Sequence, residues 1–240
     1  MSFFLECKKV KRTGFISAFL LGGLLASVFP IVNVAVRPEM FINEQGTPIS
    51  ILLNENWQMM AMINVLFVVV GACLLYHTEY ADNAMQKMNT LPIREGSIFF
   101  GKVILLCILS IVVFTMEATS VAFCSAHWFE IGTDFLSELG KCFGYSFLMS
   151  LPCIVLSLLL SSACKNMWVS LGIGVLCVLT ATILPSDNFT LTLFPYALPF
   201  QMFDGTNFIG TTHYIYAVII ELVVITLAEL LFIRIRREFE

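Results

Sequence analysis

Residues 57–76, WQMMAMINVLFVVVGACLLY, are followed directly by residues 77–102, HTEYADNAMQKMNTLPIREGSIFFGK. The first stretch carries no charge, whereas the second is polar and becomes apolar again only near its end. A transmembrane helix needs roughly 20 predominantly apolar residues, because it must cross about 30 Å of hydrocarbon at 1.5 Å per residue. The first stretch therefore predicts a membrane-spanning helix, and the second predicts a polar loop that leads back into the membrane.

The rest of the chain has the same apolar character. Hydrophobic residues make up 58% and charged residues 12%, and the mean hydropathy is +0.89, whereas soluble domains are about 45–50% apolar and 25% charged. Six apolar runs are long enough to span a membrane: residues 14–36, 57–76, 97–123, 135–162, 167–184 and 214–233. They lack the alternation of β-barrel strands. We therefore predict an all-α polytopic membrane protein, with six transmembrane helices in one domain of residues 1–240.

The basic residues predict the orientation. Eleven of the 13 Lys and Arg residues fall on one side of the predicted membrane. They precede the first run, lie in or beside residues 77–102, include Lys165, and follow the last run. Only Arg37 and Lys141 fall on the other side. Cytoplasmic loops carry an excess of Lys and Arg. We therefore expect both termini and the loop of residues 77–96 in the cytoplasm, and topology alone explains the basic clusters without nucleic acid.

Two segments are expected at the membrane surface. Residues 1–13 combine phenylalanines with lysines, which favours an interfacial helix, with a disordered basic tail as the alternative. The apolar run that follows is too long for a signal peptide. Residues 185–212 contain three prolines and five phenylalanines, which break a long helix and suit the aromatic belt of a membrane. We expect an extracellular interfacial or re-entrant segment before the last helix.

Sequence motifs for chemistry are weak. Residues 96–102 have the GxxxxGK spacing of a phosphate-binding loop, but no Ser or Thr follows and the segment enters the membrane as a helix. Lys102 is therefore interpreted as reaching the membrane surface. Cys124 and Cys142 leave a disulfide open, and no metal-binding or hydrolase motif occurs. The sequence predicts no catalytic site, no metal site and no cofactor bound by the chain itself.

Three acidic residues fall inside the predicted helices: Glu117, Glu221 and Glu229. A charge in hydrocarbon is costly and usually faces protein or water. One interpretation is that they line a polar pathway or a subunit seam. The other is that Glu117 and Glu221 bond to neighbouring helices, while Glu229 reaches the inner surface beside Arg234.

Small residues predict two places of close helix packing. Gly22 and Gly23 lie together in the first apolar run, and Gly140 and Gly144 form a GxxxG pair in the fourth. Glycines at such positions let helix backbones approach each other. We expect packing inside the bundle at both places, with dimerisation as the alternative.

Residues 79–89 are rich in helix formers, and Pro92 ends the helix at about residue 90. Apolar side chains recur there at helical spacing, at Ala81, Ala84, Met85 and Met88. A short amphipathic helix at a loop tip suits insertion into a groove on another protein.

This loop resembles the cytoplasmic loop of ABC-2-type permeases, in which an acidic residue ends the second helix and an LP…R…K pattern leads into the third. The matching residues are Glu79, Leu91, Pro92, Arg94 and Lys102. The basic N-terminus, the six helices, the interrupted outer segment and the basic C-terminus extend the likeness over nearly the whole chain. Within the superfamily, the chain is most similar to the permease subunits of lantibiotic-immunity and bacitracin-type exporters.

The resemblance implies a transporter in the bacterial cytoplasmic membrane, built from two permease subunits, identical or related, and separate ATPase subunits that bind ATP and Mg. It also implies export of an amphipathic, lantibiotic-like peptide or another hydrophobic compound, with lipid around the helices. The family's Gly-Thr-like step is Ala84-Met85 here, so the register of the loop stays open. The residues implied to dock on the ATPase are Glu79, Tyr80, Asp82, Met85, Lys87, Met88 and Pro92.

Two other functions remain as alternatives. The chain could be a non-transporting sensor or assembly component whose cytoplasmic loop binds a different protein. It could also be a self-contained secondary transporter, although the sequence shows no internal repeat or broken helices of the kind such proteins use. A bound ATPase would distinguish the permease from both.

Overall fold

The computed structural model describes residues 10, 14–42, 44, 46–80, 95–130, 132–164, 166–184, 188–203 and 208–239. Within these residues all regular secondary structure is helical. In chain order the elements are α2 (Phe15–Val36), α3 (Pro38–Ile42), α4 (Pro48–Tyr80), α6 (Glu95–Trp128), α7 (Phe135–Ala163), α8 (Met167–Ile183), α9 (Phe189–Thr192), the 3-10 helix η2 (Leu198–Phe200) and α10 (Phe208–Phe239).

Five of these helices are long and apolar enough to cross a membrane, judged by length and composition: α2, α4, α6, α7 and α10. The fifth predicted run, residues 167–184, forms α8, an apolar helix of 17 residues, which is about 25 Å long. The expected all-α polytopic architecture is confirmed. α4 begins nine residues before its apolar run, and α3 adds five residues, so most of the first predicted outer loop, residues 37–56, is helical.

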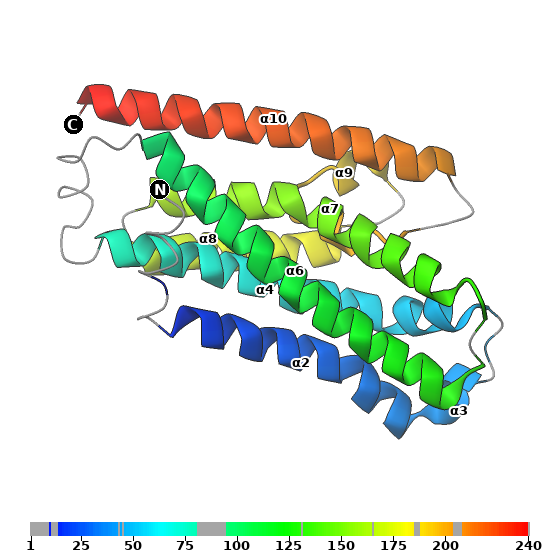
Figure 1. Cartoon of the computed structure of the whole chain (residues 1–240). Coiled ribbons are helices and arrows are strands. Elements are labelled where there is room, and N and C mark those ends of the chain that lie inside the picture. The colour runs from blue at the N-terminus through cyan, green and yellow to red at the C-terminus, as the bar shows by residue number, and fades with distance from the viewer. Residues whose placement is uncertain are drawn as a thin grey trace.

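The long helices lie side by side in one bundle, with α4 near its centre (Figure 1). α4 packs against α2, α6, α7 and α8, and α10 lies along α7 at the edge. At one end of the bundle α4 and α7 end and α6 and α8 begin, which we call the Tyr80 end (Figure 1). We call the opposite end, where α6 ends and α7 begins, the Trp57 end.

Close packing in the bundle depends on glycine at several points. A Cβ atom on Gly22 would lie 2.2 Å from the Phe67 ring, and one on Gly174 would lie 2.3 Å from Val69 Cγ1. The prediction for the first apolar run is therefore confirmed. The prediction for the GxxxG pair in the fourth run is wrong, because a Cβ atom at either of its glycines would have no neighbour within 4 Å among the described residues.

Residues 188–203 fold back into the bundle before α10 begins. Tyr196 and Leu198 are fully buried there. The Trp57 indole nitrogen donates to the Pro199 carbonyl over 3.2 Å, and the Tyr196 hydroxyl is hydrogen-bonded to Ser157 Oγ at 3.1 Å. The interrupted segment expected before the last helix is present. Residues 192–203 are packed into the bundle, whereas residues 188–191 at the start of the segment are exposed.

α7 carries a series of serines along an otherwise apolar helix. Their hydroxyls donate to carbonyls three or four residues earlier, as Ser146 does to Cys142 O and Ser161 does to Ser157 O, both over 2.8 Å. Such back-bonding satisfies a hydroxyl inside a membrane helix. α7 can therefore offer carbonyls and hydroxyls to its neighbours without leaving polar atoms exposed to lipid.

Candidate functional site

Tyr80 is the last residue of α4 and therefore stands directly before the loop that was predicted to dock. Its hydroxyl donates to the backbone carbonyl of Ser162 on α7 over 2.5 Å. Its ring stacks on Tyr76, one turn earlier, with centroids 6.5 Å apart. The end of α4 is thus held against α7.

Glu229 on α10 lies at the same place, and its side chain is 0% exposed. Ser162 Oγ donates to its carboxylate oxygens over 3.0 and 3.1 Å. The suggestion that Glu229 reaches the membrane surface is therefore wrong, because α10 places this carboxylate against α7. Ser162 connects three helices, with its carbonyl bonded to Tyr80 and its hydroxyl bonded to Glu229.

Lys102 on α6 also differs from expectation. Its side chain is 0% exposed, and its Nζ lies 4.4 Å from the centroid of the Tyr76 ring, a geometry typical of a cation–π contact. α6 begins at Glu95, so Lys102 is about two turns inside the helix, where it faces α4 and not the membrane surface.

The predicted docking residues are described only in part. Glu79 and Tyr80 form the end of α4, and only Tyr80 has a described side chain. Asp82, Met85, Lys87, Met88 and Pro92 lie outside the described residues, as do residues 1–13 apart from Val10, which is helical and buried. The docking role of these positions stays a prediction.

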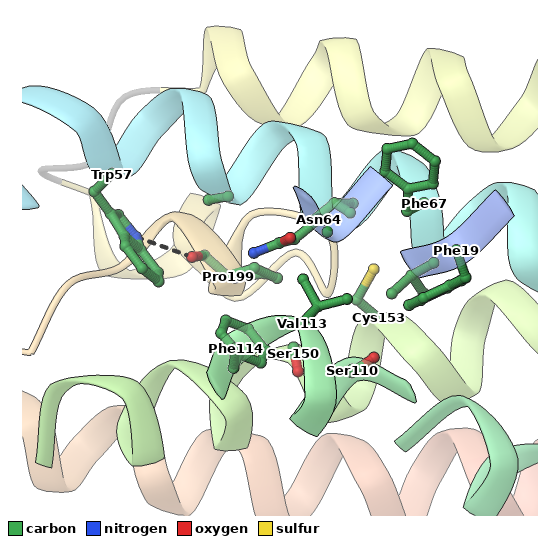
Figure 2. A pocket seen from close by; sticks show the side chains of 14 residues that line it. Phe19, Trp57, Asn64, Phe67, Ser110, Val113, Phe114, Ser150, Cys153 and Pro199 are labelled. Carbon is green, nitrogen blue, oxygen red and sulfur yellow. Dashed lines mark hydrogen bonds between the residues drawn. The ribbon is translucent and has the colours of Figure 1, made fainter. Parts of the chain in front are cut away.

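A cavity lies deeper in the bundle, between α2, α4, α6 and α7. Its volume is about 20 Å³, which is room for about one water molecule. Figure 2 shows Asn64 between the hydrogen-bonded Trp57–Pro199 pair and the rings of Phe19 and Phe67. The lining residues are Phe19, Gly23, Trp57, Ala61, Asn64, Val65, Phe67, Val68, Ser110, Val113, Phe114, Ser150, Cys153 and Pro199.

Glu117 is held beside this cavity by Asn64, whose amide donates to Glu117 Oε2 over 3.1 Å. The glutamate is 0% exposed, and its Oε1 has no hydrogen-bond partner among the described residues. The same is true of Ser110 Oγ, which lines the cavity. Sequence reasoning identified Glu117 but missed Asn64 and Ser110, whose only signal was a polar side chain within an apolar run.

Buried hydroxyls and thiols connect the re-entrant segment to α7, α8 and α4. From Tyr196 the contacts lead to Ser157, whose carbonyl accepts from Ser161 Oγ. Ser161 Oγ lies 3.0 Å from Ser170 Oγ, which lies 3.2 Å from Cys73 Sγ. Burial raises the pKa of the Tyr196 phenol well above its ordinary value. This hydroxyl therefore stays neutral.

The three predicted glutamates do not meet. Glu117 bonds to α4 and Glu229 to α7, while Glu221 on α10 is half-buried with an Oε2 that has no partner among the described residues. Cys124 and Cys142 are both buried free thiols. In the part of the chain that is described, no three His, Cys, Asp or Glu side chains are grouped so that they could hold a metal ion.

Comparison with known families identifies the class of protein. The model for "ABC-2 family transporter protein" matches residues 3–182, which is three quarters of the chain and includes the helices from α2 to α8. The chain belongs to the ABC-2 family of transporter proteins. It is a multi-pass membrane protein, and its family implies an ABC ATPase as partner. No curated protein and no solved structure was found to match it.

Proposed function

We propose that this chain is the permease subunit of an ATP-driven exporter that moves or expels an amphipathic, lantibiotic-like peptide or another hydrophobic compound. It lies in a bacterial cytoplasmic membrane with both termini and the Tyr80 end inside. Two permease subunits, identical or related, form the pathway, and two separate ATPase subunits bind ATP and Mg. The family supports the permease role, and the excess of basic residues supports the orientation.

The observation that carries the proposal is the set of buried contacts at the Tyr80 end. The loop of residues 81–94 joins α4 to α6, so an ATPase that moves this loop pulls on the ends of both helices. Tyr80 connects the end of α4 to Ser162, and Ser162 connects to Glu229. A displacement of the loop therefore reaches α7 and α10 through direct hydrogen bonds.

Site-specific photo-crosslinking tests the docking. A crosslinking residue at Met85 or Met88 should capture a protein with a Walker-type ATPase sequence, identified by mass spectrometry. The same residue at Met40, which is 51% exposed in α3 at the Trp57 end, should capture no ATPase. Capture of a different cytoplasmic protein in place of an ATPase would favour the sensor or assembly function.

Charge reversal provides a second test. Asp82→Lys together with Lys87→Glu should abolish co-purification of the ATPase, because the docking helix would present the opposite charge pattern. Cells that carry the double variant should also lose resistance to the exported peptide. Lys141→Glu, a reversal in the first turns of α7 at the Trp57 end, is the control and should leave both unchanged. An intact complex in the double variant would reject docking through residues 77–96.

A further inference from the structure

We propose that Lys102 ties the start of α6 to α4, so that the two helices joined by the loop of residues 81–94 move as one unit. The ring of Tyr76 is the group on α4 that holds its ammonium. As a step in transport, this positioning role rests on the proposed function. As a contact between two helices, it can be tested without the ATPase.

The inward position of Lys102 is costly. Its side chain is 0% exposed, although α6 begins only seven residues earlier, at Glu95, about 10 Å away along the helix. A lysine so close to a helix end usually extends its ammonium to the membrane surface. An ionisable side chain inside the membrane is expensive and usually has a function. The fold therefore uses this lysine for a contact inside the bundle.

The Tyr76 ring on α4 compensates part of this cost. Lys102 Nζ lies 4.4 Å from the centroid of the ring, and the attraction between a cation and an aromatic face is strongest where water is excluded. Tyr76 is itself buried, so water is excluded from both partners. The charge of Lys102, and not only its length, therefore holds α6 against α4.

Tyr76 extends this contact to the other helices of the Tyr80 end. Its ring stacks on the ring of Tyr80. The Tyr80 hydroxyl donates to the Ser162 carbonyl on α7, and Ser162 Oγ donates to Glu229 on α10. Lys102 thus adds α6 to a series of side-chain contacts that joins α4, α7 and α10.

The contact stands beside the loop. Tyr76 lies one helical turn before the end of α4, and Lys102 lies about two turns after the start of α6, and both helix ends lie at the Tyr80 end (Figure 1). A further polar contact between the two helices, Asn64 with Glu117, is fifteen residues further along α6, about 22 Å from Lys102. That contact is too far away to keep the start of α6 against α4. Lys102 and Tyr76 are placed to do so.

Tying the two helix ends together determines what the loop can transmit. If α4 and α6 moved independently, a pull on the loop could separate their ends without moving the rest of the bundle. Movement travels between distant sites through packed side chains and rigid elements. With Lys102 held by Tyr76, a displacement of either helix end moves the other, and both act on α7 through Tyr80.

Hydrogen–deuterium exchange of the full chain in lipid nanodiscs tests the contact without the ATPase. Lys102→Met keeps an unbranched side chain but removes the charge, and Tyr76→Leu removes the ring. In each variant the backbone amides of residues 99–105 should exchange about fivefold faster or more, as expected for the loss of a desolvated cation–π contact. The double variant should exchange no faster than the single variants, because all of them remove the same contact.

Two further variants identify the group responsible. Tyr76→Phe keeps the aromatic face and should exchange as the native chain does. Lys141→Met is the matched control, because it makes the same replacement at an exposed lysine near the Trp57 end, and it should also exchange as the native chain does.

Three results would overturn the proposal: exchange in Lys102→Met no faster than in Lys141→Met, an effect of Tyr76→Phe as large as that of Lys102→Met, or independent effects that multiply in the double variant. The first two comparisons do not require Tyr76→Leu to fold.

Transport by the complete complex tests the positioning role. The chain with its ATPase is placed in proteoliposomes, and transport of fluorescently labelled nisin, a lantibiotic, is measured together with ATP hydrolysis. Lys102→Met should leave the ATPase bound and active but lower the peptide moved per ATP by about fivefold or more, whereas Tyr76→Phe and Lys141→Met should not lower it. Unchanged transport per ATP in Lys102→Met would overturn the positioning role.

Failure of the proposed function would look different. A native chain that binds no ATPase, or a native complex that hydrolyses ATP without moving nisin, would reject export of a lantibiotic-like peptide. The exchange measurements would still decide whether Lys102 ties α6 to α4.

Discussion

Glu117 depends on a single amide for its described hydrogen bond inside the membrane. Replacing that amide by Asn64→Leu should leave the carboxylate buried without a partner and lower the free energy of unfolding by about 1 kcal/mol, since hydrogen bonds between membrane helices contribute about 0.6 and up to about 1.7 kcal/mol. The double variant Asn64→Leu, Glu117→Leu should be more stable than Asn64→Leu alone, because both partners become apolar. Equilibrium unfolding in micelles measures the free energy of unfolding of the native chain and of the single and double variants.

The pair formed by Asn33 and Asn56 is a suitable reference. The Asn33 amide donates to the Asn56 side-chain oxygen over 2.8 Å, and Asn56 is fully buried, yet neither residue lines the cavity. Replacing both by Leu should give a similar recovery of the free energy of unfolding relative to replacing one of them. If the double variant Asn64→Leu, Glu117→Leu loses as much free energy of unfolding as the two single variants together, the hydrogen bond between Asn64 and Glu117 has no energetic role.

The sequence indicated Glu117 because a carboxylate in an apolar run is conspicuous. It did not indicate Asn64, since one amide among apolar residues changes the composition of a helix very little, and partner choice depends on how the helices face each other. Lys102 was assigned to the membrane surface, and Glu229 was placed there in one of its two interpretations, for a similar reason. Long charged side chains near helix ends usually reach water, and only the packed bundle shows both turned inward.

α8 packs closely against α4 because one of its residues, Gly174, has no side chain. Gly174 faces Val69 on α4, and a Cβ atom would approach Val69 Cγ1 to 2.3 Å. Gly174→Ala should therefore lower stability by about 1–3 kcal/mol, the usual effect of overpacking a core, because a β-branched valine cannot easily rotate away. The decrease can be measured as a lower thermal unfolding midpoint in nanodiscs.

Gly172 supplies the control on the same helix. It is exposed, and a Cβ atom there would have no neighbour within 4 Å among the described residues. Gly172→Ala should leave the unfolding midpoint unchanged or slightly higher, because alanine favours helix. Equal effects of the two substitutions would mean that α8 does not pack against α4 as described.

Element boundaries were predicted less well than element number, and α4 shows why. Hydropathy placed its start at residue 57, but the helix begins at Pro48. Thr47 provides the physical signal, because its hydroxyl accepts from the Ser50 N–H over 3.3 Å and proline is favoured at the first helical position. A rule based on apolar runs misses such a start, since the first turns of α4 are only partly apolar.

At the scale of the whole molecule, the contacts at the Tyr80 end predict that their loss will leave ATP hydrolysis intact but lower the transport that accompanies it. Tyr80→Phe removes the hydrogen bond from α4 to α7, and Ser162→Ala removes the one from α7 to Glu229. Each should leave the ATPase bound and active but lower transport per ATP by about fivefold or more, a typical coupling energy. Both rates can be measured together in proteoliposomes.

Ser17→Ala is the corresponding control, because Ser17 is exposed near the start of α2 and bonds only within its own helix, to Gly14 O. Its transport per ATP should be unchanged. Unaltered transport in both Tyr80→Phe and Ser162→Ala would show that these hydrogen bonds do not carry movement from the loop.

A helix at each of the six apolar runs and the interrupted segment before α10 followed from the sequence, because both depend on the lengths of apolar runs and the positions of prolines, although only five of the six helices are long enough to span a membrane. The path of residues 188–203 into the bundle did not follow, because it depends on Tyr196 finding Ser157 and Pro199 finding Trp57. Neither pair is recognisable from spacing alone.

The same path has a consequence for the order of events during synthesis. Irregular backbone cannot face lipid and is tolerated at membrane depth only where protein surrounds it. Two hydrogen-bond partners of the segment, Trp57 and Ser157, leave the ribosome before it does, whereas a third, Tyr214 on α10, follows it and bonds to Thr192. A nascent chain that reaches the end of α8 therefore contains the partners of Tyr196 and Pro199, but Leu198 packs against Val218 of α10. Insertion of this segment is therefore a late step of biogenesis, and it is complete only when α10, which packs along α7, closes the bundle.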